Sequence, residues 1–541
     1  MGSMKTPGVY IIEKNAFPNS VVEAPTAIPA FIGYTERAVN GNDDLTNVPW
    51  KISSMTEYIQ YFGGGPDLKF EVDIKDGSLC IEGKNSYTLY YNMMLFFANG
   101  GGACYIVSVG SYKDALKKDS MITGLGKLTL EQEITLVAIP EAVNLSSSEE
   151  FKDIQQQMLS HCGNTMKNRF ALLDIYPKAN EKTKIEDQVN FFCDNIGSSF
   201  LSYGAAYFPW LNTSIVGERD LKGDMFTWTD NAYIHRTQLD AGFAEIVESL
   251  FVEEFEIKEN VVKNNHTFKL EEVVKGNIYA DGDTKETKAI GWIESVIDFK
   301  EAETGKVIKK DVKVVWLFSN NVDKQALHQA LYNVSSVYKQ AIKGVLKNLN
   351  LFPPSAAMAG IYTMVDNSRG VWKAPANVTL NYVGSTVEDI DDEQQAELNV
   401  PIHGKAVNVI RLFRGEGVKV WGARTLDGNS LDWRYVNVRR TLLFLEESIK
   451  NAARAYVFEP NDAGTWINMK CMIDSFLRSV WKRGGLAGAT PEDAFEVHIG
   501  LGDTMTAEDI LDGIMRITVL VAVTHPAEFI EITFQQQAQK S

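Results

Sequence analysis

Residues 134–140 read ITLVAIP, a run of apolar and β-branched side chains with the length of one strand. Two similar runs follow, FALLDI at 170–175 and GAAYF at 204–208. The stretches between them are long enough for helices, and the first of these opens with three serines followed by Glu149, an N-cap pattern. Apolar strands that alternate with helices are typical of a parallel sheet. The pattern predicts an α/β fold class, with the parallel layer at about 126–212.

Other segments differ from this layer in amino-acid composition and in their pattern of apolar residues. Residues 213–320 are rich in Glu, Lys and Asn, with turn signals at Asp281-Gly282 and Thr304-Gly305, so we expect an inserted, mostly β domain exposed to solvent. Helical patterns predict one helix near 323–349 and two long helices near 432–455 and 465–483.

The composition is that of a globular chain with two to four domains: 541 residues, 45% hydrophobic and 23% charged. The net charge of -17 argues against a nucleic-acid coat or a polybasic membrane binder. Five cysteines without a CxxC indicate neither a disulfide framework nor a zinc site. No apolar window has the length of a signal peptide or a membrane span, so we expect no direct membrane insertion.

Catalytic motifs are missing from the sequence. The seven histidines have no metal-ligand spacing, and neither GxSxG nor GxxxxGK[ST] occurs. The glycines at 63–65 and 100–102 fit helix ends better than a phosphate cradle, and His161-Cys162 lacks a residue to orient a thiol nucleophile. We therefore expect a protein that is not an enzyme and has no metal or cofactor.

Both ends of the chain carry a short β-prone segment behind a proline-containing linker. The N-terminal segment includes Val9, Tyr10, Ile11 and Ile12, and the C-terminal one includes Phe529, Ile530, Ile532 and Phe534. Such strands need a sheet edge, either in their own chain or in a neighbour. The pattern leaves both possibilities open.

Motifs along the chain resemble the contractile tail sheath proteins of phages, R-type pyocins and extracellular contractile injection systems. The N-terminal match is Thr6-Pro7-Gly8-Val9-Tyr10 followed by PTAIPAFIG at 25–33. The middle matches are FANGG at 97–101 leading into Cys104-Tyr105, and GVWKAPAN at 370–377. The C-terminal matches are 408–411, VWGART at 420–425, EPND at 459–462 with Thr465-Trp466, and WKRGGLAG at 481–488. The resemblance covers roughly 1–110 and 340–541.

This resemblance implies a structural subunit that polymerises with itself as stacked six-membered rings around an inner tube. The helical sleeve contracts to drive the tube through a target envelope, and a baseplate and a tail-terminator cap are further partners. Terminal arms in this family add strands to neighbouring subunits, with Pro18, Pro25 and Pro526 as the implied hinges. The implied segments are an N-terminal arm (1–20), a first core part (21–125), an α/β domain (126–212), a variable outer insertion (213–320), a second core part (321–404), a C-terminal sheath domain (405–525) and a C-terminal arm (526–541).

Sheaths of this family contact the tube through a helix of the C-terminal domain, largely by charge. The candidate is the ridge formed by Lys470, Arg478, Lys482 and Arg483, whose alternative interpretation is a solvated helix face. Residues 405–483 hold 14 Lys+Arg against 8 Asp+Glu, so this segment is +6 in an otherwise acidic chain. A basic lining would suit an acidic tube.

Two other functions stay open at this point. One is an α/β ligand-binding or hydrolytic enzyme that uses the parallel layer. The other is a non-contractile scaffold with an adhesive insertion at 213–320. For a sheath, we expect assembly in the bacterial cytoplasm as part of a phage tail or a tail-like particle, released outside the cell or anchored to a membrane.

Overall fold

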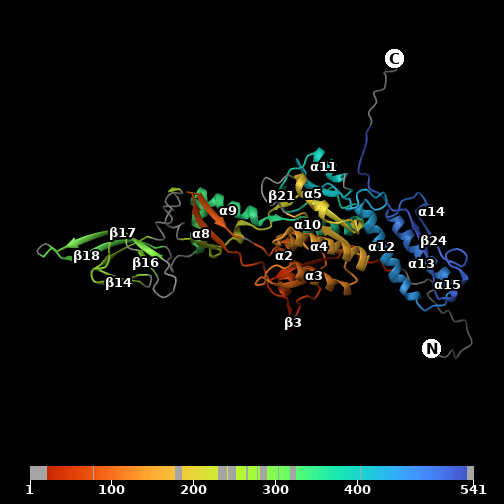
Figure 1. Cartoon of the computed structure of the whole chain (residues 1–541), viewed down its shortest axis with the longest axis horizontal. Helices are drawn as coiled ribbons and strands as arrows, with labels where there is room; N and C mark the ends of the chain where they lie inside the picture. The colour runs from red at the N-terminus through yellow and green to blue at the C-terminus, as the bar shows by residue number, and fades with distance from the viewer. Residues whose placement is uncertain are drawn as a thin grey trace, which may run out of the picture. The chain divides into compact units, whose positions relative to one another are not determined.

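The computed structural model describes residues 21–76, 78–83, 85–176, 185–229, 240–241, 252–263, 266–276, 278–280, 289–301, 304–316, 324–401 and 404–532. The chain divides into two compact units (Figure 1). The first comprises residues 1–65, 87–213 and 352–541, and the second comprises residues 66–86 and 214–351. The expected N-terminal arm at 1–20 lies outside the described residues.

A nine-stranded mixed sheet forms the centre of the first unit. Its strand order is β20 (Val378–Thr379), β23 (Gly417–Val420), β22 (Val407–Phe413), β10 (Gly204–Phe208), β9 (Phe170–Leu173), β8 (Leu136–Ala138), β1 (Pro29–Thr35), β7 (Cys104–Ser111) and β4 (Trp50–Ile52). The strands from β22 to β7 are parallel, and those at the edges are antiparallel. The apolar runs at 134–140, 170–175 and 204–208 contain β8, β9 and β10, so the predicted parallel layer and the α/β fold class are confirmed.

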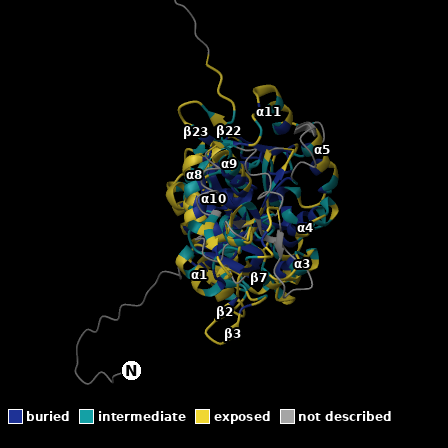
Figure 2. Cartoon of the chain, turned by 90° about the vertical axis from the view of Figure 1, so that its left-hand side faces the viewer, coloured by how far each residue is buried: buried dark blue, intermediate teal, exposed yellow. Residues whose placement is uncertain are grey.

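Helices cover both faces of this sheet. On one face, side chains of α3 (Lys118–Lys127), α4 (Ser148–Ser160) and α5 (Ile185–Asn195) share one core with the strands. On the other face, α2 (Leu89–Ala98) packs against β1, and α10 (Ser355–Arg369) packs against β8, β9 and α2. Figure 2 shows the buried strands between α10 on one side and α3 and α4 on the other. This layering buries the sheet on both faces, which explains its continuous apolar strands.

Two buried carboxylates hold the second helix layer to the sheet. Glu141, beyond the end of β8, accepts the backbone N–H groups of Thr88 and Leu89 at 2.8 and 3.2 Å, at the start of α2. Asp174, directly after β9, accepts the N–H and O–H of Ser355 at 2.9 and 2.5 Å, at the start of α10. Burial raises the pKa of both carboxyl groups to about 7.

The C-terminal part of the unit is a helical pair with a small sheet. The elements are α12 (Val436–Ala453), α13 (Ala463–Lys482), α14 (Pro491–Ala494), β24 (Phe495–His498), α15 (Ala507–Leu511) and β25 (Thr518–Val521). The α12 and α13 helices pack through Phe444 and Phe476, whose ring centroids lie 5.9 Å apart. Both long helices were predicted, and their bounds differ from the expected ones by a few residues at most.

A buried ion pair joins α12 to the sheet layers. The guanidinium of Arg440 donates to both carboxylate oxygens of Asp366 in α10, at 3.0 and 2.6 Å, and to the carbonyl of Thr26 at 2.8 Å. The N–H of Ala24 donates to the Ser448 hydroxyl at 3.0 Å. The chain around Pro25 is therefore fixed to α12, in contrast to the hinge that the resemblance implied there.

The other elements of the first unit are short. They are β2 (Val39–Asn40), β3 (Asp43–Asp44), α1 (Met55–Phe62), β11 (Leu211–Thr213), β21 (Val383–Thr386) and α11 (Asp392–Asn399), with β19 (Leu351–Phe352) at the boundary between units. Gly63 follows α1 with φ of 84°, and Gly100 follows α2 with φ of 91°. Both glycines therefore serve the helix-end role that was expected, because their φ values are in the left-handed region.

The second unit is mostly β in its described part. Its strands are β5 (Phe70–Lys75), β6 (Ser78–Glu82), β12 (Phe226–Trp228), β13 (Val252–Ile257), β14 (Asn260–Lys263), β15 (His266–Lys269), β16 (Ile278–Ala280), β17 (Ala289–Lys300) and β18 (Val307–Trp316). The helix predicted near 323–349 is two helices, α8 (Lys324–Val334) and α9 (Ser336–Leu349). Ser335 separates them because its hydroxyl accepts the N–H of Tyr338 as an N-cap.

Candidate functional site

The C-terminal segment beyond β25 exposes large apolar side chains. Phe529, Ile530 and Ile532 are 76%, 78% and 69% exposed. Phe534, the fourth predicted arm residue, lies outside the described residues. Burying one such side chain is worth about 1.5–3 kcal/mol. The segment therefore presents apolar surface that its own chain, in the part described, leaves uncovered.

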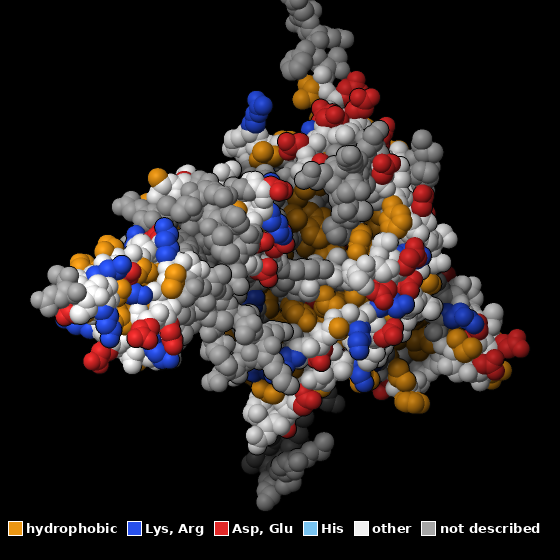
Figure 3. Space-filling model, turned by 60° about the vertical axis from the view of Figure 1, so that its left-hand side comes forward, with side chains coloured by type: hydrophobic (Ala, Val, Ile, Leu, Met, Phe, Trp, Pro, Cys, Tyr) orange, Lys and Arg blue, Asp and Glu red, His pale blue; other side chains and the backbone are white. Residues whose placement is uncertain are grey.

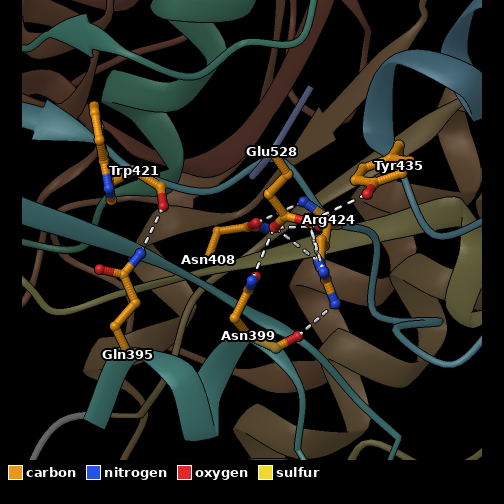
Figure 4. Close-up of polar contacts among 7 residues, drawn as sticks. All are labelled: Gln395, Asn399, Asn408, Trp421, Arg424, Tyr435 and Glu528. Atoms are coloured by element: carbon orange, nitrogen blue, oxygen red, sulfur yellow. Dashed lines mark hydrogen bonds and ion pairs between the residues drawn. The ribbon is translucent and has the colours of Figure 1, made fainter. Parts of the chain in front are cut away.

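The residue just before this segment, Glu528, is called here the root of the arm. A polar network holds it in place (Figure 4). Glu528 accepts the Nε–H of Arg424 at 3.0 and 3.2 Å on its two oxygens, the amide of Asn399 at 2.8 Å and the hydroxyl of Tyr435 at 3.1 Å. A terminal nitrogen of Arg424 also pairs with the carboxylate at 2.5 Å. The backbone N–H of Arg424 donates to Asn408 at 2.7 Å, and its guanidinium also donates to the carbonyl of Asn399 at 2.9 Å.

Electrostatics keep Glu528 ionised in this network. Partial burial acts to raise the pKa of its carboxyl group, but the hydrogen bonds from Arg424 and Asn399 outweigh it and hold the pKa below its usual value. The amide of Asn437 fixes the preceding chain by donating to the carbonyl of Thr524 at 2.9 Å. Hydrogen bonds thus hold the chain on both sides of Pro526, and the exposed apolar residues begin at Phe529, three residues beyond the expected start of the arm at 526.

The two-stranded sheet formed by β24 and β25 is a second feature of the C-terminal part. Phe495 is paired with Val521, and His498 with Thr518, in antiparallel register. No third strand of the described residues joins this sheet, although Leu486 forms a single antiparallel bridge to Val523 just beyond β25. Leu520 on β25 is 53% exposed, so the sheet offers edges and some apolar surface for a further strand.

The basic ridge on α13 separates into two groups. Lys470, Arg478 and Lys482 are exposed, and none of them has an ion pair with a described residue. Arg483 instead pairs with Glu23 and lies 5.2 Å from the ring centre of Trp372. Arg483 therefore helps to fix the first described residues of the chain, whereas the other three remain available.

The surface near the C-terminal segment is acidic. Figure 3 shows acidic side chains at the top of the face it presents, where α11 and the C-terminal segment lie in Figure 1. The exposed acids of α11 are Asp392, Glu393 and Glu397. The exposed acids of α11 and the exposed basic side chains of α13 thus belong to different elements of the first unit.

Comparisons with known proteins relate these features to a family. Residues 429–537 match the family model described as the phage tail sheath C-terminal domain. The tail sheath protein of Vibrio phage KVP40 is 25% identical over 134 residues, which cover 25% of this chain and 20% of that protein. A putative prophage major tail sheath protein of Pseudomonas aeruginosa is 29% identical over 100 residues, or 18% of this chain and 25% of that protein. The chain thus matches a fifth to a quarter of these curated relatives.

Solved structures extend the similarity to the whole chain. A chain in the 6-fold symmetrised baseplate of the anti-feeding prophage is 25% identical, with a TM-score of 0.56 and coverage of 99% of this chain and 100% of that one. A chain of the PVC extracellular contractile injection system, in its contracted sheath complex, is 25% identical with a TM-score of 0.54 and 99% coverage of both chains. The chain is thus similar to contractile tail sheath proteins in its C-terminal part by sequence and over nearly its whole length by structure. The predicted resemblance to this family is confirmed.

The region matched by the family model includes most of the features described above. The α13 helix, the β24–β25 sheet and Glu528 lie within 429–537, whereas Arg424 and Asn399 lie before it. Sequence reasoning placed Arg424 in a matched motif but missed its partner, because Glu528 follows 104 residues later with no local signal. The N-terminal arm residues Val9, Tyr10, Ile11 and Ile12 lie outside the described residues.

The His161-Cys162 pair considered in the sequence is buried in the described structure. Cys162 is fully buried, and burial raises the pKa of its thiol to about 12. Its neighbour His161 lies in a π-helical turn, 2.8 Å from a guanidinium nitrogen of Arg169, and burial followed by the charge of Arg169 lowers the histidine pKa to about 4. Among the described residues, no group of three His, Cys, Asp or Glu side chains is placed to hold a metal ion. None of the helices searched in the described residues is long and apolar enough to cross a membrane.

Proposed function

We propose that this sheath protein polymerises into stacked six-membered rings around an inner tube, and that the sleeve contracts to drive the tube through a target envelope. The single observation that supports this best is the C-terminal segment, which is anchored at Glu528 and apolar and exposed from Phe529 onward. The similarity to chains in a contracted sheath complex and a 6-fold symmetrised baseplate supports the same reading.

In this proposal the C-terminal arm adds a strand to the β24–β25 sheet of a neighbouring subunit. Ile530, Ile532 and Phe534 alternate along the chain, so in a strand they lie on one face and can cover apolar surface there. Burial of Phe529, Ile530 and Ile532 would contribute about 5–9 kcal/mol per arm before the cost of association is subtracted. The N-terminal arm, with Val9 to Ile12, would join a neighbour in the same way.

The second proposed contact is with the tube. The ridge that would meet acidic side chains of the tube protein consists of Lys470, Arg478 and Lys482. Arg483 lies next to Lys482 in the sequence and pairs with Glu23. Each exposed ion pair is worth about 0–1 kcal/mol, but the contact repeats on every subunit. Salt screens such contacts, which suits a tube that must be released.

The proposal includes further partners and a location. A baseplate would begin the sleeve and a tail-terminator cap would end it. Assembly would take place in the bacterial cytoplasm, within a phage tail or a tail-like particle that is released or anchored to a membrane.

The test is a deletion of residues 529–541 in the full chain, co-expressed with the inner tube protein of its own particle. We expect a soluble subunit with the melting temperature of the wild type that forms no sleeves in electron micrographs. Deletion of residues 1–20 should have the same effect. A protein with the substitution Glu531→Ala, an exposed position within the arm, serves as the assembling control. Normal sleeves from either deletion would contradict strand donation.

A further inference from the structure

The turn between α12 and α13 holds an aromatic side chain in an unusual position. Phe458 is fully exposed, at 102% of the reference area, and its φ is 73°. A bulky residue in the left-handed region costs roughly 1–2 kcal/mol, and full exposure of the ring recovers none of it. Val457 beside it is 60% exposed. Strain of this kind persists where the surrounding structure imposes it, and it often marks a functional position.

The turn around Phe458 is rigid. The side chain of Asn461 accepts the indole N–H of Trp466 at 2.7 Å and donates to the carbonyl of Ile514 at 3.1 Å. The N–H of Glu459 donates to the carbonyl of Tyr456 at 3.1 Å. These hydrogen bonds fix the backbone that carries Phe458, so its ring is presented from a defined position, as are the aromatic anchors at protein interfaces.

The same unit contains a cavity that matches a phenyl ring in size. Its volume is about 120 Å³, and its apolar lining includes Pro25, Phe170, Leu443 and Phe444. Protein cavities of about 150 Å³ with apolar linings hold a benzene molecule. Exposed residues, among them Asn451, form part of the rim, so the cavity opens to the surface.

One polar group in this cavity lacks a partner. Asn168 is 9% exposed and lines the cavity, and its side-chain oxygen accepts no hydrogen bond from the described residues. A buried acceptor without a donor is unfavourable by about 1–3 kcal/mol. The cavity thus suits an occupant with an aromatic ring and an adjacent N–H donor.

We propose that Phe458 of one sheath subunit inserts into this cavity of a second copy. The inference rests on the proposed self-assembly and adds a contact between copies that involves neither arm. Among the charged side chains, Arg454 before the turn is exposed with no ion pair to a described residue. Glu133 and Glu447, which line the cavity, pair with Lys51 and Lys450 of their own chain, so the proposed contact rests on the ring and the cavity rather than on charge. Because the ring and the cavity are different patches, the contact is head-to-tail and can repeat from one copy to the next around a ring or along a helical assembly.

The direct test replaces Phe458 with the photoreactive p-benzoylphenylalanine in the full chain. Sleeves are assembled with the tube protein from a mixture of isotope-labelled and unlabelled subunits, irradiated and analysed by mass spectrometry. We expect mixed-isotope crosslinks from position 458 to peptides that contain Pro25 or residues 443–451. Crosslinks to the tube protein, to another surface of the sheath, or to no chain at all would overturn the proposal.

A paired substitution provides the second measurement. Phe458→Ala should raise the protein concentration needed for sleeve formation at least about tenfold, the effect of losing one interface anchor. Ile467→Ala is the matched control. Ile467 is a large apolar residue that is likewise exposed, at 61%, but it lies on the regular helix α13. Both variants should keep the wild-type melting temperature. If the wild type forms sleeves and Phe458→Ala forms them equally well, the contact is wrong while the proposed function stands; if the wild type forms none, the proposed function fails.

Discussion

Replacing Glu528 with alanine tests whether the root of the C-terminal arm is fixed. The substitution leaves the guanidinium of Arg424, whose side chain is 3% exposed, without its carboxylate. Breaking a buried ion pair costs about 3–5 kcal/mol. The side chain of Glu528 is itself 20% exposed, so we take the lower end of this range. Detaching the root of the arm should then become easier by about 3 kcal/mol. Because each 1.4 kcal/mol is a factor of ten, the open population of this segment should rise about a hundredfold.

Hydrogen exchange of the unassembled subunit measures this change. In the wild type, the N–H of Ala522 donates to the carbonyl of Ala494 at 2.8 Å, and that of Ala487 donates to the carbonyl of Ala522 at 2.8 Å. In Glu528→Ala, these amides should exchange up to about a hundredfold faster, while those of the central sheet stay unchanged. The Glu531→Ala protein is the control. Less than a threefold change in Glu528→Ala, or an equal change in the control, would refute the anchor.

Three further predictions concern the ridge, the buried ion pair and pH. Reversing the charge of Arg478 and Lys482 to Glu should abolish co-assembly with the tube while the melting temperature is kept; unaltered co-assembly in micrographs would rule out the ridge. Asp366→Ala should lower the free energy of unfolding by about 3–5 kcal/mol in urea titrations, because Arg440 then stays buried without its partner, and a loss below 1 kcal/mol would contradict this role. The pKa of Asp174 is about 7 in the folded protein and near 4 when unfolded, so its proton stabilises the fold at pH 5 and this stabilisation fades as pH rises to 7, by about 1.4 kcal/mol per pH unit. Asp174→Asn should flatten this decline in a pH series of unfolding curves, and an unchanged slope would show that the carboxyl is not protonated in the fold.

Local patterns were sufficient to predict the sheet and the long helices. The runs at 134–140, 170–175 and 204–208 are continuous apolar strands because the sheet is covered on both faces, and this signal needs no knowledge of distant residues. The α12 and α13 helices likewise follow from a periodic apolar face. The split of one predicted helix at Ser335 was missed because apolar periodicity continues across the N-cap.

The polar anchors were not predictable from the sequence. Arg440 and Asp366 are separated by 74 residues, and Arg424 and Glu528 by 104, so no local spacing indicates either pair. In each case the arginine lies in a helix or motif that was recognised, but its partner depends on tertiary packing. The exposure of Phe458 was not predictable either. A phenylalanine is ordinarily expected in a core, and this one is fully exposed.

The most direct test of strand donation within a self-assembled sleeve is a cryo-EM map of the full chain assembled with its tube protein. The account predicts six subunits per ring, sleeves of a long and a short form, and residues 529–534 as a strand beside β24–β25 of a neighbouring subunit. A map in which residues 529–534 pair within their own chain, or in which the protein forms no sleeve, would contradict it.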